Sequence, residues 1–98
     1  MIEVLRTTEF DAWLSGLKDD RAAARIAARL ARLAGGNPGD VKATSATGIH
    51  ELRVDYGPGY RVYFTYRGPV VVVLLAGGDK RTQSKDIKRA AAIAATLE

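Results

Sequence analysis

Cysteine is absent from this chain of 98 residues, and histidine, tryptophan and methionine occur once each. Without cysteine the chain can form neither a disulfide framework nor a thiolate metal site. Long apolar segments are missing too, because the longest run, residues 70–76, falls far short of the ~20 residues that span a bilayer. We therefore expect no metal, no cofactor and no association with a membrane.

The first residues, MIEVLRTTEF, also lack the cationic and apolar segments of a signal peptide. Together with the lack of cysteine, this predicts a cytoplasmic protein. The length predicts one domain, residues 1–98, able to bury roughly 65% of its unfolded surface. A domain of this size has no room for a large closed active-site cavity.

Positive charge exceeds negative charge along the chain. Lysine and arginine number 15 against 11 acidic residues, which gives a net charge of +4. Such a balance in a small domain favours a polyanionic partner, either a nucleic acid or an acidic protein segment.

The hydrophobic pattern predicts an α+β fold. Strand patterns cover residues 1–6, 49–56, 60–66 and 70–76, with a weak edge strand at 41–44. Helical patterns cover residues 8–17, 20–34 and 84–97, with Thr8, Asp19 or Asp20, and Ser84 as expected N-caps. The order predicts a two-layer fold, in which an N-terminal helix pair and a C-terminal helix pack on one face of a mainly antiparallel sheet of four to five strands.

The segment ELRVDYGPGYRVYFTY, residues 51–66, places a Gly-Pro-Gly turn between two strands in which apolar and polar residues alternate. A three-residue turn at 57–59 places both apolar sets on the buried face, whereas a slip of one residue would mix the faces. The two arginines, Arg53 and Arg61, are therefore predicted on the solvent face. The expected pairs are Leu52 with Phe64, Val54 with Val62, Arg53 with Tyr63, and Asp55 with Arg61.

The last predicted strand is followed by AGGDKRTQSKD, residues 76–86. Glycines at the end of a strand, followed by cations at the start of a helix, favour an anion-binding site. The segment is not a Walker A loop, because its glycine spacing and Lys-Ser/Thr pair are missing. The cations and amide concerned are Lys80, Arg81, Gln83 and Lys85.

Two segments in combination, GIHELRVDYGPGYRVYF and VVVLLAGGDKRTQSKDIKRA, resemble the addiction-module killer proteins of the RelE/ParE toxin superfamily, in the HigB-like, phage-derived branch. The upstream segment EFDAWLSGLKDDRAAARIAARLARLAGGNPGD resembles the same branch, so the likeness covers nearly the whole chain. This resemblance implies a RelE-like fold and a toxin of a type II toxin-antitoxin module. It also implies ribosome-dependent cleavage of mRNA, neutralisation by a helix-turn-helix antitoxin, and contact with operator DNA only through that antitoxin.

The resemblance also assigns roles to residues of this chain. Arg53 and Arg61 match the basic positions on the sheet of RelE-type toxins, and Lys80 or Arg81 matches the cation after the last strand. Tyr63, between the sheet arginines, is a further candidate for catalysis, and the expected RNA contacts are Arg53, Arg61, Lys80, Arg81 and Lys85.

Cleavage of RNA without a metal requires removal of the 2′-OH proton, stabilisation of the phosphate charge and protonation of the leaving 5′-oxygen. Arginine meets the second requirement, because its guanidinium fork matches phosphate oxygens and stays charged. Toxins of the family have a C-terminal tyrosine or histidine where this chain has Lys85, Asp86 and Ile87, so the proton-transfer residue stays open. The candidates are Tyr63, Tyr56, Lys80, Lys85, Asp86 and His50.

Each feature also has a purely structural interpretation. The sheet arginines could be solvated residues paired with Asp55 and Glu51, and His50 falls on the apolar side of its strand. The helix stripe of Arg21, Arg25, Arg29 and Arg32 is most simply a solvated face, with contact to the antitoxin or to ribosomal RNA as the alternative.

Two other functions remain open from sequence. One is a ParE-like poison of DNA gyrase without nuclease activity, for which the sheet arginines would be unimportant. The other is a nucleic-acid-binding module without toxicity, whose expression would not arrest growth.

Overall fold

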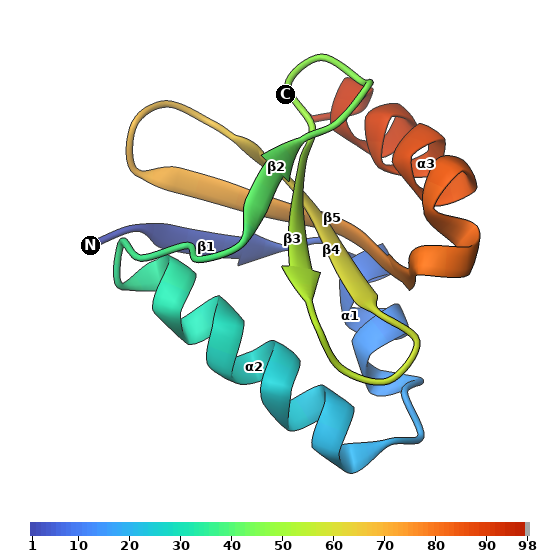
Figure 1. Cartoon of the computed structure of the whole chain (residues 1–98). Helices are drawn as coiled ribbons and strands as arrows, with labels where there is room; N and C mark the ends of the chain where they lie inside the picture. Colours follow the sequence, from blue (N-terminus) through green and yellow to red (C-terminus); the bar gives the residue numbers. More distant parts are fainter. Residues whose placement is uncertain (98) are drawn as a thin grey trace.

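The computed structural model describes residues 1–97, and Figure 1 shows their path. An N-terminal strand precedes two helices, four further strands and a C-terminal helix. In chain order the elements are β1 (Glu3–Arg6), α1 (Thr8–Ser15), α2 (Asp20–Ala34), β2 (Val41–Ala43), β3 (His50–Val54), β4 (Tyr60–Tyr66), β5 (Val71–Asp79), a single 3₁₀ turn (Lys80–Thr82) and α3 (Gln83–Ala95).

The five strands form one sheet in the order β1-β5-β4-β3-β2. Neighbouring strands from β2 to β5 run antiparallel, while β1 runs parallel to β5 at the edge. The predicted α+β class, with a mainly antiparallel sheet, an N-terminal helix pair and a C-terminal helix, is confirmed. Within residues 1–97, every helix is too short or too polar to cross a bilayer.

Side chains at the helix starts explain where two of the helices begin. Thr7, one residue before the predicted Thr8, accepts a hydrogen bond from the Phe10 amide at 3.1 Å and caps α1. Asp19 caps α2, as predicted, by accepting from the amides at the start of that helix. Ser84 does not cap α3, because the helix already begins at Gln83 after the 3₁₀ turn.

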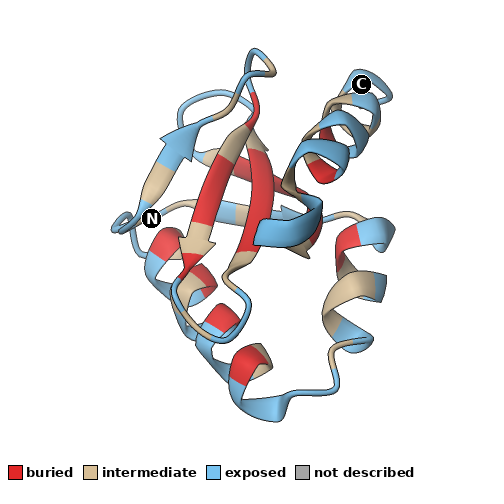
Figure 2. Cartoon of the chain, turned by 45° about the vertical axis from the view of Figure 1, so that its right-hand side comes forward, coloured by how far each residue is buried: buried red, intermediate tan, exposed pale blue. Residues whose placement is uncertain are grey.

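The helices lie on both faces of the sheet, not on one face as the sequence predicted (Figure 1). Helices α1 and α2 cover one face, where Phe10 and Ile26 pack against inward residues such as Leu52. Helix α3 covers the other face, where Ala90 packs with Tyr63 and Leu75. The central strands are therefore buried on both sides, as the red segments in Figure 2 show.

The hairpin of β3 and β4 keeps the predicted faces but not the predicted register. Arg53 lies opposite Arg61, and Val54 lies opposite Tyr60, so the pairing differs by two residues from the expected one. A slip of two leaves every side chain on its own face, which is why alternation alone could not detect it. The turn contains five residues instead of three, and both Gly57 (φ 56°) and Gly59 (φ 84°) adopt the left-handed conformation within it.

Strand β5 continues through the two glycines that were predicted to follow it. A Cβ on Gly77 would lie 2.1 Å from the indole ring of Trp13, and a Cβ on Gly78 would lie 1.8 Å from a carboxylate oxygen of Asp86. Both positions require glycine because α1 and α3 approach β5 closely from opposite faces. Lys80 is therefore the first residue after the strand and lies at the end of the sheet.

Candidate functional site

Three of the predicted site residues meet at the end of the sheet next to the β3–β4 turn. Arg53 from β3, Arg61 from β4 and Lys80 from the start of the 3₁₀ turn line one surface hollow of about 480 Å³. Antiparallel pairing places the two arginines opposite each other, and β5 ends beside β4. We call this the turn-side hollow, and its remaining lining residues are Asp40, Asp55, Gly57, Pro58 and Gly59.

A second hollow of about 400 Å³ adjoins the first and has the same three cations in its wall. We call it the helix-side hollow, because it extends toward α3. Besides the shared cations, its lining has one lysine, one glutamate and residues with amide, hydroxyl and apolar side chains. These additional residues are Lys42, Ala43, Thr44, Ser45, Glu51, Gln83 and Ile87.

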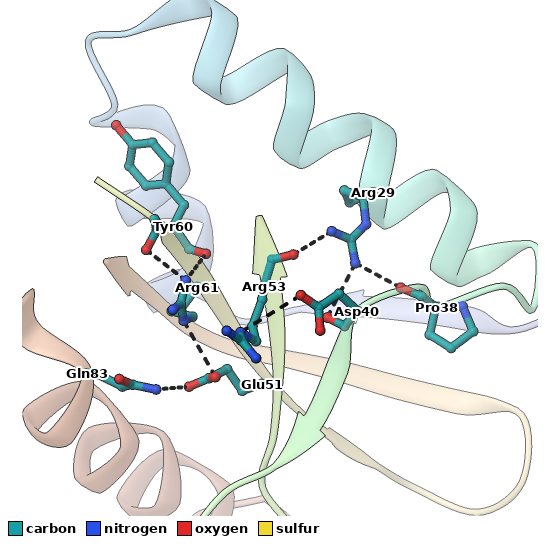
Figure 3. A network of polar contacts seen from close by, with 9 residues as sticks. Arg29, Pro38, Asp40, Glu51, Arg53, Tyr60, Arg61 and Gln83 are labelled. Carbon is teal, nitrogen blue, oxygen red and sulfur yellow. Dashed lines mark hydrogen bonds and ion pairs between the residues drawn. The ribbon is translucent and has the colours of Figure 1, made fainter. Parts of the chain in front are cut away.

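Arg61 is buried, so its predicted place on the solvent face is wrong. Arg61 is 6% exposed and Glu51 is 5% exposed. The Nε of Arg61 lies 3.5 Å from a carboxylate oxygen of Glu51. Its Nη1 donates to the main-chain oxygens of Gly59 and Tyr60 at 3.0 and 3.2 Å. Gln83 of α3 donates to the other oxygen of Glu51 at 2.5 Å (Figure 3). The C-terminal helix thus helps to hold Arg61 in the wall of the hollows.

Arg53 is the more accessible arginine. Its side chain is 32% exposed, and its Nε lies 3.9 Å from a carboxylate oxygen of Asp40 (Figure 3). A pair at this distance and exposure contributes little to stability. Arg53 can therefore exchange this contact for an incoming anion at small cost.

Arg81 and Lys85 line neither of these two hollows. They line a separate hollow of about 470 Å³ together with Lys88. The guanidinium of Arg81 is held by Asp79 through two contacts of 2.9 and 3.3 Å. Hydrogen bonding from Arg81 in turn lowers the pKa of the Asp79 carboxyl below its usual value.

Most of the proton-transfer candidates do not reach the two hollows. Tyr63 is fully buried beneath α3, and the buried Asp86 accepts a hydrogen bond from Thr82 and pairs with Arg89 at 3.6 Å. His50 packs on Phe64 and Tyr66 at the far end of β3, as its structural interpretation predicted. Tyr56 lies under the guanidinium of Arg25. Lys80 alone among the six candidates lines the hollows.

The buried phenol of Tyr63 leads to a prediction about alkaline stability. Burial, and then the negative charges of Glu51 and Asp86, raise the pKa of Tyr63 above its usual value near 10. The folded protein therefore holds this proton more tightly than the unfolded chain, so the free energy of unfolding should fall as pH rises above about 10. We expect Tyr63→Phe to remove most of this loss, and Tyr66→Phe, at an exposed position, to leave it unchanged. Denaturant unfolding at pH 8 and pH 11 measures the difference, and equal losses in both variants contradict the assignment.

At neutral pH the same substitution should cost little. Within residues 1–97 the hydroxyl of Tyr63 lies near the carboxylate of Glu51 but does not meet it, or any other group, in full hydrogen-bond geometry. Removing a buried polar group that lacks a partner is close to neutral or stabilising.

The sequence named Glu51 only as a solvated partner of the sheet arginines and Gln83 only as part of an anion-binding segment, and it did not indicate Asp40 at all. Alternation places Glu51 on the same face as the two arginines, and this signal was available. The apolar stripe of the C-terminal helix was a second signal, because an apolar helix face must pack against a face of the sheet. Asp40 had no such signal, since it reaches Arg53 only through the path of the α2–β2 connection.

The arrangement can bind an anion, and its charge is finely balanced. Four cations line the two hollows, Lys42, Arg53, Arg61 and Lys80, against the three carboxylates of Asp40, Asp55 and Glu51. Guanidinium groups at a surface hollow match phosphate oxygens in geometry and charge.

Comparison with known proteins gives the family of the chain. Residues 12–97 match the family described as "Phage derived protein Gp49-like (DUF891)". The chain belongs to this Gp49-like family. It is a toxin-type family of RelE/HigB-like proteins, which agrees with the coarser part of the predicted resemblance. A protein of Haemophilus influenzae named "Uncharacterized protein" is 53% identical over 96 residues, covering 98% of this chain and 96% of that protein.

Proposed function

We propose that this Gp49-like protein is the HigB-like toxin of a type II toxin-antitoxin module, and that it inhibits translation by cleaving mRNA on the ribosome without a metal ion. The observation that carries the proposal is the meeting of Arg53, Arg61 and Lys80 on adjoining hollows. Membership of a toxin-type family supports the biological setting.

The geometry suits cleavage in which the RNA supplies its own nucleophile. The 2′-hydroxyl gives up its proton to solvent, and its oxygen forms a bond to the adjacent phosphorus while the bond to the 5′-oxygen breaks, leaving a 2′,3′-cyclic phosphate and a 5′-hydroxyl. Arg53 and Arg61 stabilise the charge that builds on the phosphate oxygens. Lys80 lines both hollows and is the proton donor that we assign to the leaving oxygen.

Partners follow from the same surface. A toxin that can cleave mRNA must be held inactive during growth, so we propose a helix-turn-helix antitoxin whose acidic and apolar groups cover the hollows. Operator DNA would then be contacted only by the antitoxin. An action on ribosomes and mRNA also implies a cytoplasmic location.

A cleavage assay with purified ribosomes and a defined mRNA tests the proposal. We expect the wild-type protein to cut the mRNA only when ribosomes are present, and Arg53→Ala to cut about 10²-fold more slowly. Arg67→Ala is the matched control, since Arg67 is exposed in the β4–β5 turn and lines none of the hollows described above. Folding should be nearly unchanged in both variants.

The competing functions give different results in parallel assays. A gyrase poison would leave the mRNA intact and inhibit DNA supercoiling, with Arg53→Ala as inhibitory as the wild type. A nucleic-acid-binding module without toxicity would do neither and would not arrest growth when expressed. Either pattern rejects the proposed nuclease activity.

A further inference from the structure

Arg29 of α2 makes contacts that a solvated helix residue would not make. Its guanidinium donates hydrogen bonds to three main-chain oxygens in two other segments (Figure 3). One acceptor is Arg53 in β3, and the others are Pro38 at 3.0 Å and Asp40 at 3.4 Å, in the connection between α2 and β2. A single side chain therefore ties the helix, the connection and the strand together.

The connection is shaped around this guanidinium. Gly39 adopts a positive φ of 74°, and a Cβ there would lie 3.0 Å from Nη2 of Arg29. The positive φ favours glycine, and the Cβ of any other residue would crowd the guanidinium. The chain between Pro38 and Asp40 wraps the end of the Arg29 side chain.

Arg29 contacts the main chains of Arg53 and Asp40, and the side chains of these two residues form an ion pair in the turn-side hollow. The amide of Arg53 donates to the carbonyl of Asp40 at 2.9 Å, and the two side chains form the 3.9 Å ion pair. Both side chains line the hollow. Because Arg29 contacts both carbonyls, it fixes the separation of Arg53 and Asp40 and the direction in which each leaves the main chain.

We propose that Arg29 is a positioning residue for the turn-side hollow, acting through Arg53 and Asp40 without contacting RNA itself. The functional part of this inference rests on the proposed nuclease activity. A displacement of about 1 Å in a catalytic group can cost ~10² in rate, so a side chain that fixes the main chain beneath Arg53 affects catalysis from a distance. Arg21, another residue of the stripe, is exposed, and its side chain makes no such contacts within residues 1–97.

A double-mutant cycle separates positioning from a general effect on folding. We expect Arg29→Met to slow ribosome-dependent cleavage by ~10–10², and Arg53→Ala to slow it by ~10². If Arg29 acts through Arg53, the double variant should be no slower than Arg53→Ala alone. Arg29→Lys should rescue only in part, because lysine lacks the fork that reaches several carbonyls. Arg21→Met is the control with the same charge change on the same helix, and it should cleave as the wild type does.

Hydrogen exchange provides a readout that does not depend on activity. In Arg29→Met, the amide of Arg53 should exchange faster than in the wild type, while the amide of Val62 in the centre of β4 should not change. Gly39→Ala should shift exchange at Arg53 in the same direction, because its Cβ crowds the same guanidinium and its positive φ is strained. It also serves as the second variant if Arg29→Met folds poorly.

The outcomes are distinct. Multiplicative rate losses in the cycle, or unchanged exchange at Arg53 in both Arg29→Met and Gly39→Ala, overturn the positioning role and leave the nuclease proposal standing. A wild-type protein that does not cleave mRNA rejects the nuclease proposal, and the exchange measurement then still decides whether Arg29 positions Arg53.

Discussion

Replacing Arg61 with alanine is expected to slow mRNA cleavage by ~10²–10³ and to abolish growth arrest. The side chain lines both hollows, and its guanidinium is held by Glu51 and by two main-chain oxygens. A donor fixed in this way needs no reorganisation when charge builds on the phosphate, which is the condition for a large catalytic contribution. Single-turnover cleavage on purified ribosomes measures the effect.

Because Arg61 is buried, the alanine variant must be compared at a temperature where it is folded. Arg61→Lys is the informative second variant, since it keeps a positive charge beside Glu51 but loses the bidentate geometry. We expect Arg61→Lys to retain most of the stability and to recover only part of the rate. A lysine variant as active as the wild type would show that charge alone, without the guanidinium fork, supports the reaction.

Replacing Glu51 with alanine is expected to lower the free energy of unfolding by about 3–5 kcal/mol, because the guanidinium of Arg61 is left buried without its carboxylate. Glu51 also accepts the hydrogen bond from Gln83, so the start of α3 loses an anchor on the sheet. Glu3→Ala is the matched control, since Glu3 is exposed in the edge strand β1, and it should change stability by less than about 0.5 kcal/mol. Urea unfolding of the two variants gives the comparison, and equal midpoints contradict the buried pair.

A double replacement extends this second prediction. Exchanging a buried ion pair for apolar residues of similar size is often neutral or stabilising. The variant that combines Glu51→Leu with Arg61→Met should therefore recover most of the stability lost in Glu51→Ala. It should remain inactive in cleavage, because the guanidinium is gone. Recovery of stability without recovery of activity would show that the ion pair is needed for cleavage and not for folding.

The faces of the hairpin could be predicted from sequence, but its register could not. Alternation places Leu52 and Val54 on the face covered by α1 and α2, and the structure agrees. The same alternation is satisfied by any even shift, so it did not distinguish Val62 from Phe64 as the partner of Leu52. The five-residue turn, with Gly57 and Gly59 in the left-handed conformation, sets the pairing of Leu52 with Val62.

The second helical layer was within reach of sequence reasoning. An apolar run such as that of β5 indicates a strand covered on both faces, and the C-terminal helix was the remaining element able to cover it. Arg61 and Glu51 pointed to the opposite conclusion, because charged residues in alternating positions usually indicate a face exposed to solvent. Their mutual pairing is the exception that permits burial.

For the site, topology was enough to bring Arg53, Arg61 and Lys80 together. Two paired strands and the end of their neighbour must place these residues at one end of the sheet. The contributions of Asp40 and Arg29 depended on the path of a connection with two glycines, at positions 36 and 39, in left-handed conformations. No periodic pattern encodes such a path, so these contacts become visible only in three dimensions.

The most direct test of the central claim is to map mRNA 5′ ends in cells after the protein is induced without its antitoxin. Wild-type protein and Arg53→Ala are compared at equal abundance, with Arg67→Ala as the control. The account predicts new 5′-hydroxyl ends within translated regions for the wild type and for Arg67→Ala, and their loss in Arg53→Ala. Growth arrest with intact mRNA, unaffected by Arg53→Ala, would contradict it.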